Sequence, residues 1–193
     1  RLKLVARLPK LISTQKLKTT KLMKMIMELV TPAKGDLPDI YCDMDQVLCD
    51  FIGGAEDVVG MSFAQAPKDD RWKAIRDTKD FWATLDWMPG AKRLYSFIQK
   101  YDTNILSAYS ERDANSRPGK LKWLSKNTKI KRGNINLVQR ADKQKYAMKD
   151  GKPNVLIDDY IKNIKEWEAK GGIGVHHTNV GKTLAELKRL GFK

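Results

Sequence analysis

The sequence of 193 residues is poor in cysteine and histidine, and it contains no long apolar run. Its two cysteines, Cys42 and Cys49, form no CxxC pair and no Cys/His spacing, which excludes a zinc site and a disulfide framework. No apolar run approaches the ~20 residues that a helix needs to cross a bilayer. A hydrophobic fraction of 41% still allows a sizeable core. We therefore expect a globular, cytoplasmic protein with reduced, buried thiols.

Acidic residues are almost missing from the first 35 positions. Residues 1–35 hold nine Lys or Arg and a single acid, Glu28, whereas the other 158 residues hold 28 basic and 22 acidic side chains. This asymmetry predicts a basic arm over residues 1–35, followed by a domain over 36–193. Four apolar residues of the arm recur at helical spacing: Leu22, Met25, Ile26 and Leu29. This spacing predicts an amphipathic helix.

The chemistry of the arm leaves several roles open. A basic, acid-poor segment can bind nucleic acid, lie on an anionic membrane, direct import into an organelle or dock on an acidic protein partner. The apolar stripe also allows a simpler role, in which the helix packs on its own domain.

From residue 39 onward, short apolar runs alternate with segments of helical periodicity. The runs predict five buried strands, at Ile40–Cys42, Thr103–Leu106, Asn134–Val138, Asn154–Ile157 and Gly172–Val175. Helices are expected near 90–100, 117–127, 142–149, 160–170 and 181–190. Such alternation predicts an α/β fold with a mostly parallel sheet covered on both faces. Residues 52–88 contain helical and aromatic pieces without a clear strand, and we expect a small helical cap there, inserted after the first strand.

Acids and a hydroxyl follow three of the predicted strands. Asp43 and Asp45 follow the first strand, Ser107 the second, and the pair Asp158-Asp159 the fourth. In an open parallel sheet, ligands collect beyond the carboxyl ends of the strands. Clustered carboxylates repel one another unless a cation lies between them, and Mg²⁺ prefers carboxylate oxygens. The pattern therefore predicts a Mg²⁺ site.

These groups suit phosphoryl transfer. A carboxylate can attack phosphorus, and a second acid can protonate the leaving oxygen and then deprotonate water. The charge of the phosphate also requires a hydroxyl and a cation, for which Ser107 and either Lys143 or Lys145 are candidates.

The same residues resemble the motifs of the haloacid-dehalogenase-like (HAD) hydrolase superfamily. Ile40–Leu48 resembles the first motif, Ile105–Ser107 the second, Lys143 the third and Leu156–Asp159 the fourth. The resemblance implies a Rossmann-like three-layer fold with a cap after the first strand. It also implies a phosphatase that works through an aspartyl-phosphate intermediate.

The resemblance assigns a role to each site residue. Asp43 would be the nucleophile, and Asp45 the acid and base that also offers its main-chain carbonyl to Mg²⁺. Asp158 and Asp159 would complete the metal site. Ser107 and Lys143 would bind the phosphate.

Within the superfamily, the resemblance narrows to the 5′(3′)-deoxyribonucleotidases, including phage-encoded relatives. Phe81-Trp82, together with Lys120 and Trp123, supports it, and the family places aromatics such as Phe81 and Trp82 around the nucleobase. It implies a phosphatase of nucleoside monophosphates in the cytoplasm or in a phage-infected cell. The alternatives are the same chemistry on nucleic-acid ends or sugar phosphates, and a virion or nucleic-acid-associated structural protein docked by the arm.

Three departures from the family pattern concern the surroundings of the site. Gln46 stands where glycine is frequent, so the bend after Asp45 must accept a side chain. Ala108-Tyr109-Ser110 replaces a proline after the second motif. Arg140 precedes Lys143 by one residue more than a substrate-binding arginine of the family would.

Two adjacent histidines, His176 and His177, end the last predicted strand. Adjacent residues on a strand point to opposite faces, so the two are not expected to bind a metal ion together.

Overall fold

The computed structural model describes residues 37–193, and the predicted basic arm lies outside the described residues. Residues Pro38–Leu190 form one compact unit. No helix in the described part of the chain is both long and apolar enough to cross a lipid bilayer.

A parallel sheet of five strands organises this unit, in the order β3-β2-β1-β6-β7. Its strands are β1 (Ile40–Cys42), β2 (Asn104–Ala108), β3 (Ile135–Val138), β6 (Val155–Asp158) and β7 (Ile173–His176). All five predicted strands are present; β1 has its predicted bounds, and the ends of the other four shift by at most two residues. The largest shift places Ser107 inside β2, because pairing with β3 continues as far as Ala108. The predicted α/β fold with a parallel sheet is thus confirmed.

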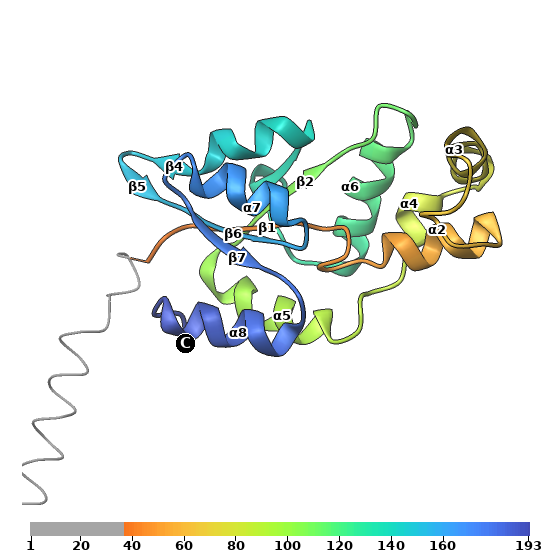
Figure 1. The fold of residues 1–193 in the computed structure, drawn as a ribbon. Helices are drawn as coiled ribbons and strands as arrows, with labels where there is room; N and C mark the ends of the chain where they lie inside the picture. Colours follow the sequence, from red (N-terminus) through yellow and green to blue (C-terminus); the bar gives the residue numbers. More distant parts are fainter. Residues whose placement is uncertain (1–36) are drawn as a thin grey trace, which may run out of the picture. The chain divides into compact units, whose positions relative to one another are not determined.

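Helices cover both faces of the sheet, as Figure 1 shows. Helices α5 (Ala91–Ile98) and α8 (Val180–Arg189) contact each other on one face, and α7 (Ile161–Glu168) contacts the 3₁₀ helix η3 (Arg140–Tyr146) on the other. Helix α6 (Ser116–Asn127) connects β2 to β3, and η1 (Gln99–Tyr101) and η2 (Arg132–Asn134) are single turns. A core cluster fills the space between the sheet and α7; it includes Tyr41, Leu106, Leu156, Ile164 and Trp167.

The helix predicted over residues 142–149 is wrong in its second half. The 3₁₀ helix η3 ends at Tyr146, and a hairpin follows, with β4 (Met148–Lys149) antiparallel to β5 (Lys152–Pro153). Asp150 and Gly151 form its turn, with φ of 50° and 74°. Two successive positive φ values are typical of a two-residue hairpin turn, and Asp-Gly is a preferred sequence for it. This local signal outweighs the helical periodicity.

Three helices lie between β1 and α5, where a helical insertion was expected. They are α2 (Phe51–Val59), α3 (Lys68–Asp77) and α4 (Phe81–Thr84). Aromatic rings link them, because Phe51 stacks on Trp82 with ring centroids 5.2 Å apart and also meets Phe63 and Trp72. We call Phe51, Phe63, Trp72, Phe81 and Trp82 the aromatic cluster.

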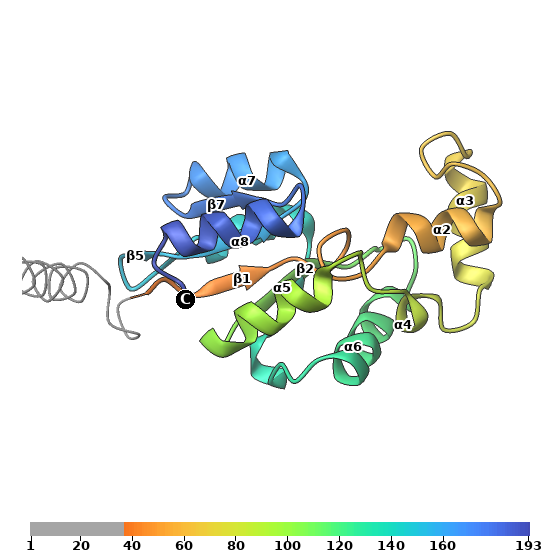
Figure 2. The same cartoon turned by 90° about the horizontal axis from the view of Figure 1, so that it is seen from below.

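Helix α4 packs directly against α6, and Figure 2 shows the two side by side. Their approach depends on Gly119, since a Cβ atom at this position would lie 2.5 Å from the Cβ atom of Trp82. Real Cβ contacts are essentially never this short, so a larger residue at position 119 would push the helices apart. A glycine in the middle of a helix is otherwise unfavourable by about 1 kcal/mol relative to alanine.

We expect Gly119→Ala to lower the free energy of unfolding by about 1–2 kcal/mol, because the overpacking at Trp82 exceeds the gain in helix propensity. Urea denaturation checks this result. Gly133→Ala is the matched control, because a Cβ atom there meets nothing within 4 Å. Equal stability of the two variants would contradict the close contact between α4 and α6.

Candidate active site

The first two acids of the site meet because β1 and β6 are neighbours. Cys42 pairs with Ile157, and the main-chain N–H of Asp43 donates to the carbonyl of Ile157 at 2.8 Å. Asp43 follows the last residue of β1, and Asp158 is the last residue of β6. Both carboxylates are buried, with 6% and 0% of the residue exposed. The strand register thus brings the first and fourth predicted motifs together.

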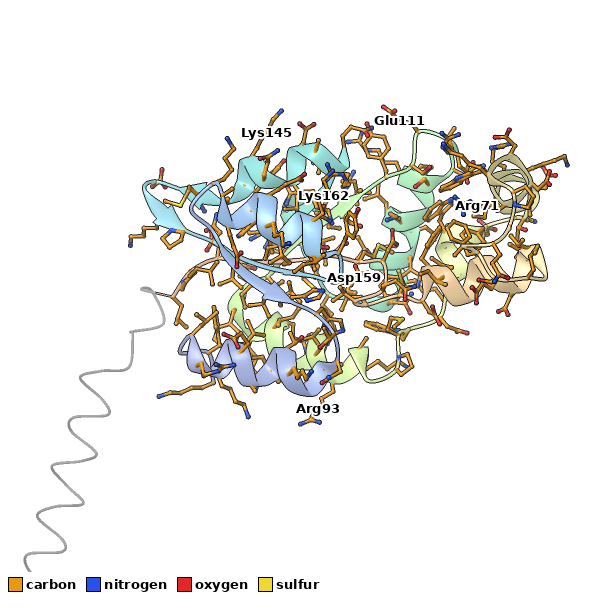
Figure 3. The ribbon with its side chains drawn as sticks, viewed as in Figure 1. Arg71, Arg93, Glu111, Lys145, Asp159 and Lys162 are labelled. Atoms are coloured by element: carbon orange, nitrogen blue, oxygen red, sulfur yellow. The ribbon has the colours of Figure 1, made fainter. Side chains whose placement is uncertain are left out.

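Lys143 lies between these two carboxylates. Its Nζ is 2.8 Å from Asp43 Oδ2 and 2.7 Å from Asp158 Oδ2. Burial alone would lower the pKa of this lysine, but the charges of Asp43 and Asp158 raise its pKa above the ordinary value. Lys145, the alternative candidate, is exposed and pairs with Asp142 at 2.7 Å. Figure 3 shows Lys145 on the outer side of η3, so only Lys143 reaches the acids.

A third carboxylate completes a group that fits a divalent cation. Asp43, Asp158 and Asp159 each offer an oxygen, and these oxygens lie within 4.8 Å of one another. Burial and the charge of Asp43 raise the pKa of Asp158 to about 6. Burial, Asp43 and Asp158 raise the pKa of Asp159 to about 7. Carboxylates under such repulsion, with only oxygen donors, fit Mg²⁺.

Asp45 belongs to a second charged group beside the first. Its Oδ2 atom is 2.5 Å from Nζ of Lys120, which also donates to Ser107 Oγ at 3.1 Å and to the Ala108 carbonyl at 2.7 Å. Lys120 is fully buried, whereas 28% of the Asp45 side chain is exposed. The predicted residues Asp45 and Ser107 are therefore brought together by a lysine. The side chain of Asp45 lies outside the three-carboxylate group, so the structure does not gather all four predicted metal ligands by their side chains.

The chain bends sharply after Asp45. Gln46 has a φ of 56°, in the left-handed region that glycine adopts most readily. Its Nε2 donates to Asp50 Oδ1 at 3.2 Å, and the carbonyl of Met44 accepts from the N–H groups of Leu48 and Cys49. These bonds stabilise a backbone conformation that a glutamine disfavours on its own. The bend after Asp45 can therefore accept the side chain of Gln46.

The aromatic residues Phe81 and Trp82 are packed rather than open. They are 4% and 3% exposed, and the Trp82 indole donates to Asp113 at 2.7 Å. Phe51 covers the ring of Trp82 and is only partly buried. Nζ of Lys120 lies 5.3 Å from the Trp82 ring centroid, so the aromatic cluster adjoins the group around Asp45. The role of Phe81 and Trp82 in substrate binding stays a prediction.

Two polar residues complete these groups without a role predicted for them: Lys120, which the sequence offered only as support for the resemblance, and Asn163, which it did not single out. Lys120 precedes the buried pair Trp123 and Leu124 by three and four residues, a helical spacing that places it on the buried face of α6. That signal was available in the sequence. Asn163 donates to both oxygens of Asp158 at 3.0 Å. It lies five residues after Asp158, and only the start of α7 after the strand brings it back to that carboxylate.

The side chains of His176 and His177 have different partners, which agrees with the prediction that they point to opposite faces. His176 is exposed and its Nε2 lies 2.9 Å from the carbonyl of Asp159, whereas His177 is buried and bonds Thr183 at 2.8 Å.

No protein-family model and no curated protein matches the sequence. Among solved structures, a hydrolase from Streptococcus pneumoniae TIGR4 matches with a TM-score of 0.50 and 12% identity, over 79% of this chain and 98% of that one. A hydrolase from Pseudomonas syringae gives 0.44 and 17% identity, over 79% and 90%. A HAD family hydrolase from Deinococcus radiodurans R1 with bound phosphate and sodium gives 0.47 and 14%, over 80% and 88%. The likeness to the Streptococcus pneumoniae hydrolase supports the Rossmann-like fold.

We expect Lys143→Met to lower the free energy of unfolding by on the order of 3 kcal/mol, because it leaves two buried carboxylates without their cation. Urea denaturation in EDTA, which keeps the site free of metal, checks this result. Lys145→Met, a change to the exposed neighbour, is expected to leave stability unchanged within error. If Lys143→Met were as stable as Lys145→Met, the claim that Lys143 compensates the buried charges of Asp43 and Asp158 would be wrong.

Proposed function

We propose that the chain is a Mg²⁺-dependent phosphatase of the HAD superfamily that hydrolyses nucleoside monophosphates in the cytoplasm. The observation that carries the proposal is the buried Lys143 between Asp43 and Asp158, with Asp159 beside them and Asp45 two residues after Asp43. This arrangement agrees with the motif resemblance residue by residue. The two buried, free cysteines agree with a reducing compartment.

In the first step, a carboxylate oxygen of Asp43 attacks phosphorus and the ester P–O bond breaks. The Asp43 carboxylate is oriented from two sides, because Oδ1 accepts from the N–H of Met44 at 2.7 Å and Oδ2 contacts Lys143. The departing alkoxide takes a proton from Asp45, whose partly exposed carboxyl group is accessible to it. The phosphoryl group is then bound to Asp43 as an acyl phosphate.

In the second step, water attacks the phosphorus of the acyl phosphate, its proton passes to Asp45, and the bond to Asp43 breaks. Ser107 and the ammonium groups of Lys143 and Lys120 supply a hydroxyl and positive charge for the phosphate oxygens. The carboxylates of Asp43, Asp158 and Asp159 would hold Mg²⁺, with the main-chain carbonyl of Asp45 as the resemblance implies. Bound Mg²⁺ supplies positive charge that offsets the repulsion between phosphate and carboxylates.

A nucleotide suits the neighbourhood of the site better than a bare sugar phosphate. The aromatic cluster adjoins Asp45 through Lys120, and its members Phe51, Phe63 and Trp72 are only partly buried. Base stacking on an aromatic ring is worth about 1–3 kcal/mol per base. Phe81 and Trp82 would support this surface from beneath, with Phe51 as the ring nearest to Trp82.

We expect the purified protein to release phosphate from deoxynucleoside monophosphates when Mg²⁺ is present, and to lose at least about a thousandfold in rate on Asp43→Asn. Asp39→Asn is the matched control, since Asp39 precedes the other end of β1 and pairs with Lys149. A malachite green assay over nucleotides, deoxyribose 5-phosphate and an aryl phosphate measures both points. Release from none of them, or full activity of Asp43→Asn, would end the proposal.

A second candidate function is the same chemistry on nucleic-acid ends, and the charge of residues 1–35 favours it. Lysines that neutralise phosphates release counterions and so raise the affinity for a polymer. We expect replacement of Lys16, Lys18, Lys21 and Lys24 by glutamine in the full chain to lower kcat/KM for a 5′-phosphorylated oligonucleotide about tenfold at low salt. The mononucleotide rate serves as the control. Equal losses on both substrates, or none on either, would remove the arm from substrate binding.

A further inference from the structure

The carboxylate of Asp158 is held by more than Lys143. Asn163, on the first turn of α7, is 6% exposed, and its Nδ2 donates to both Oδ1 and Oδ2 of Asp158 at 3.0 Å. The main-chain N–H of Tyr160 donates to Oδ1 as well, at 2.9 Å. Asp158 therefore has donors around both oxygens, and Asn163 is the one side chain other than Lys143 that an observed bond joins to it within residues 37–193.

Asn163 is itself held by an ion pair at the surface of the domain. Nη1 of Arg140 donates to Oδ1 of Asn163 at 3.0 Å, and the same guanidinium pairs with both oxygens of Glu166, at 2.6 and 3.3 Å. Asn163 and Glu166 lie three residues apart on α7, which puts them on one face of the helix. Arg140 is the first residue of η3, the element that also carries Lys143.

The donors and acceptors of this chain allow a single orientation of the amide. A guanidinium has only donors and a carboxylate only acceptors, so the amide between them must turn its oxygen to Arg140 and its nitrogen to Asp158. Without Arg140, Asp158 alone would orient the amide, and the side chain of Asn163 would lose the bond that fixes its oxygen end. Hydrogen bonds to a charged carboxylate are stronger than those between neutral groups, so weaker bonds from Asn163 would leave the Asp158 carboxylate less firmly oriented.

We propose that Arg140 is a positioning residue that acts through Asn163 to fix Asp158 for metal binding. This inference rests on the proposed function only in taking Asp158 as a ligand of the divalent cation. It differs from the role that the resemblance suggested for an arginine near position 140, which was contact with the substrate. The side chains that Arg140 bonds, Asn163 and Glu166, both belong to α7.

The test measures the affinity of the metal itself. Mn²⁺ takes the same oxygen ligands as Mg²⁺, and titration of the full chain followed by electron paramagnetic resonance reports free Mn²⁺ without any substrate. We expect Arg140→Met and Asn163→Ala each to weaken Mn²⁺ binding about tenfold, as loss of an outer partner of a ligand typically does. Lys162→Met is the matched control, since Lys162 also approaches Glu166, at 3.9 Å, but makes no bond to Asn163. Figure 3 marks Lys162 on α7.

A double variant decides whether Arg140 acts through Asn163. If it does, Arg140→Met adds nothing in the Asn163→Ala protein, so the two effects do not multiply. Glu166→Gln loosens Arg140 without replacing it, and we expect a smaller loss in the same direction. The Glu166→Gln variant therefore tests the inference even if Arg140→Met does not fold. The KM for a nucleotide, measured at saturating Mg²⁺, should change less than twofold in Arg140→Met.

Several results would overturn the inference. They are unchanged Mn²⁺ affinity in both Arg140→Met and Glu166→Gln, multiplying effects in the double variant, an equal loss in Lys162→Met, or no Mn²⁺ binding by the wild type. A rise in the KM for the nucleotide at saturating metal would instead indicate that Arg140 contacts the substrate. If the wild type binds Mn²⁺ but hydrolyses no phosphate ester, the proposed function fails while this inference is still decided by the affinities.

Discussion

The structure depends on one buried cation, Lys143, held between Asp43 and Asp158. The end of β1 must meet two much later segments, the middle of η3 and the end of β6, for this contact to form. Each member would be unstable alone, because an isolated buried charge is costly. The need to bury them together therefore links the chemistry of the site to the integrity of the sheet.

A second lysine, Lys120, organises the other half of the site in a different way. It reaches Asp45 from helix α6 and joins a carboxylate, a hydroxyl and a main-chain carbonyl. Lys143 thus holds the acids that would take the metal and the phosphoryl group, whereas Lys120 holds the acid that would move protons. The separation of the two lysines keeps the two carboxylates of the DxD sequence in different surroundings, which is the usual way for one site to run nucleophilic and acid–base chemistry together.

Much of the fold and of the site followed from sequence patterns of short range. Five apolar runs predicted the five strands, and the acids after them predicted the edge of the sheet at which Asp43, Asp158 and Asp159 gather. The failures came from tertiary contacts and turn chemistry. The helix expected over 142–149 yields to the Asp150-Gly151 hairpin turn. Lys120 and Asn163 are polar residues on helices; the spacing of Lys120 from Trp123 and Leu124 marked it as buried, whereas the burial of Asn163 depends on how α7 packs beside β6. No periodicity in the sequence revealed that Phe81 and Trp82 are packed beneath Phe51.

The close approach of α4 to α6 has a consequence for how such a protein can diversify. Gly119 lets Trp82 pack against α6, and the next residue, Lys120, contacts Asp45. A slide or rotation of α6 would therefore disturb both the aromatic cluster and the contact with Asp45. Helix α3 packs mainly on α2, and its Trp72 lies with its ring centroid 6.4 Å from that of Phe51, so substitutions on α3 can alter the aromatic cluster without moving α6. Changes on the α3 side of this insertion are thus separable from the contacts of Asp45, whereas changes at α6 are not.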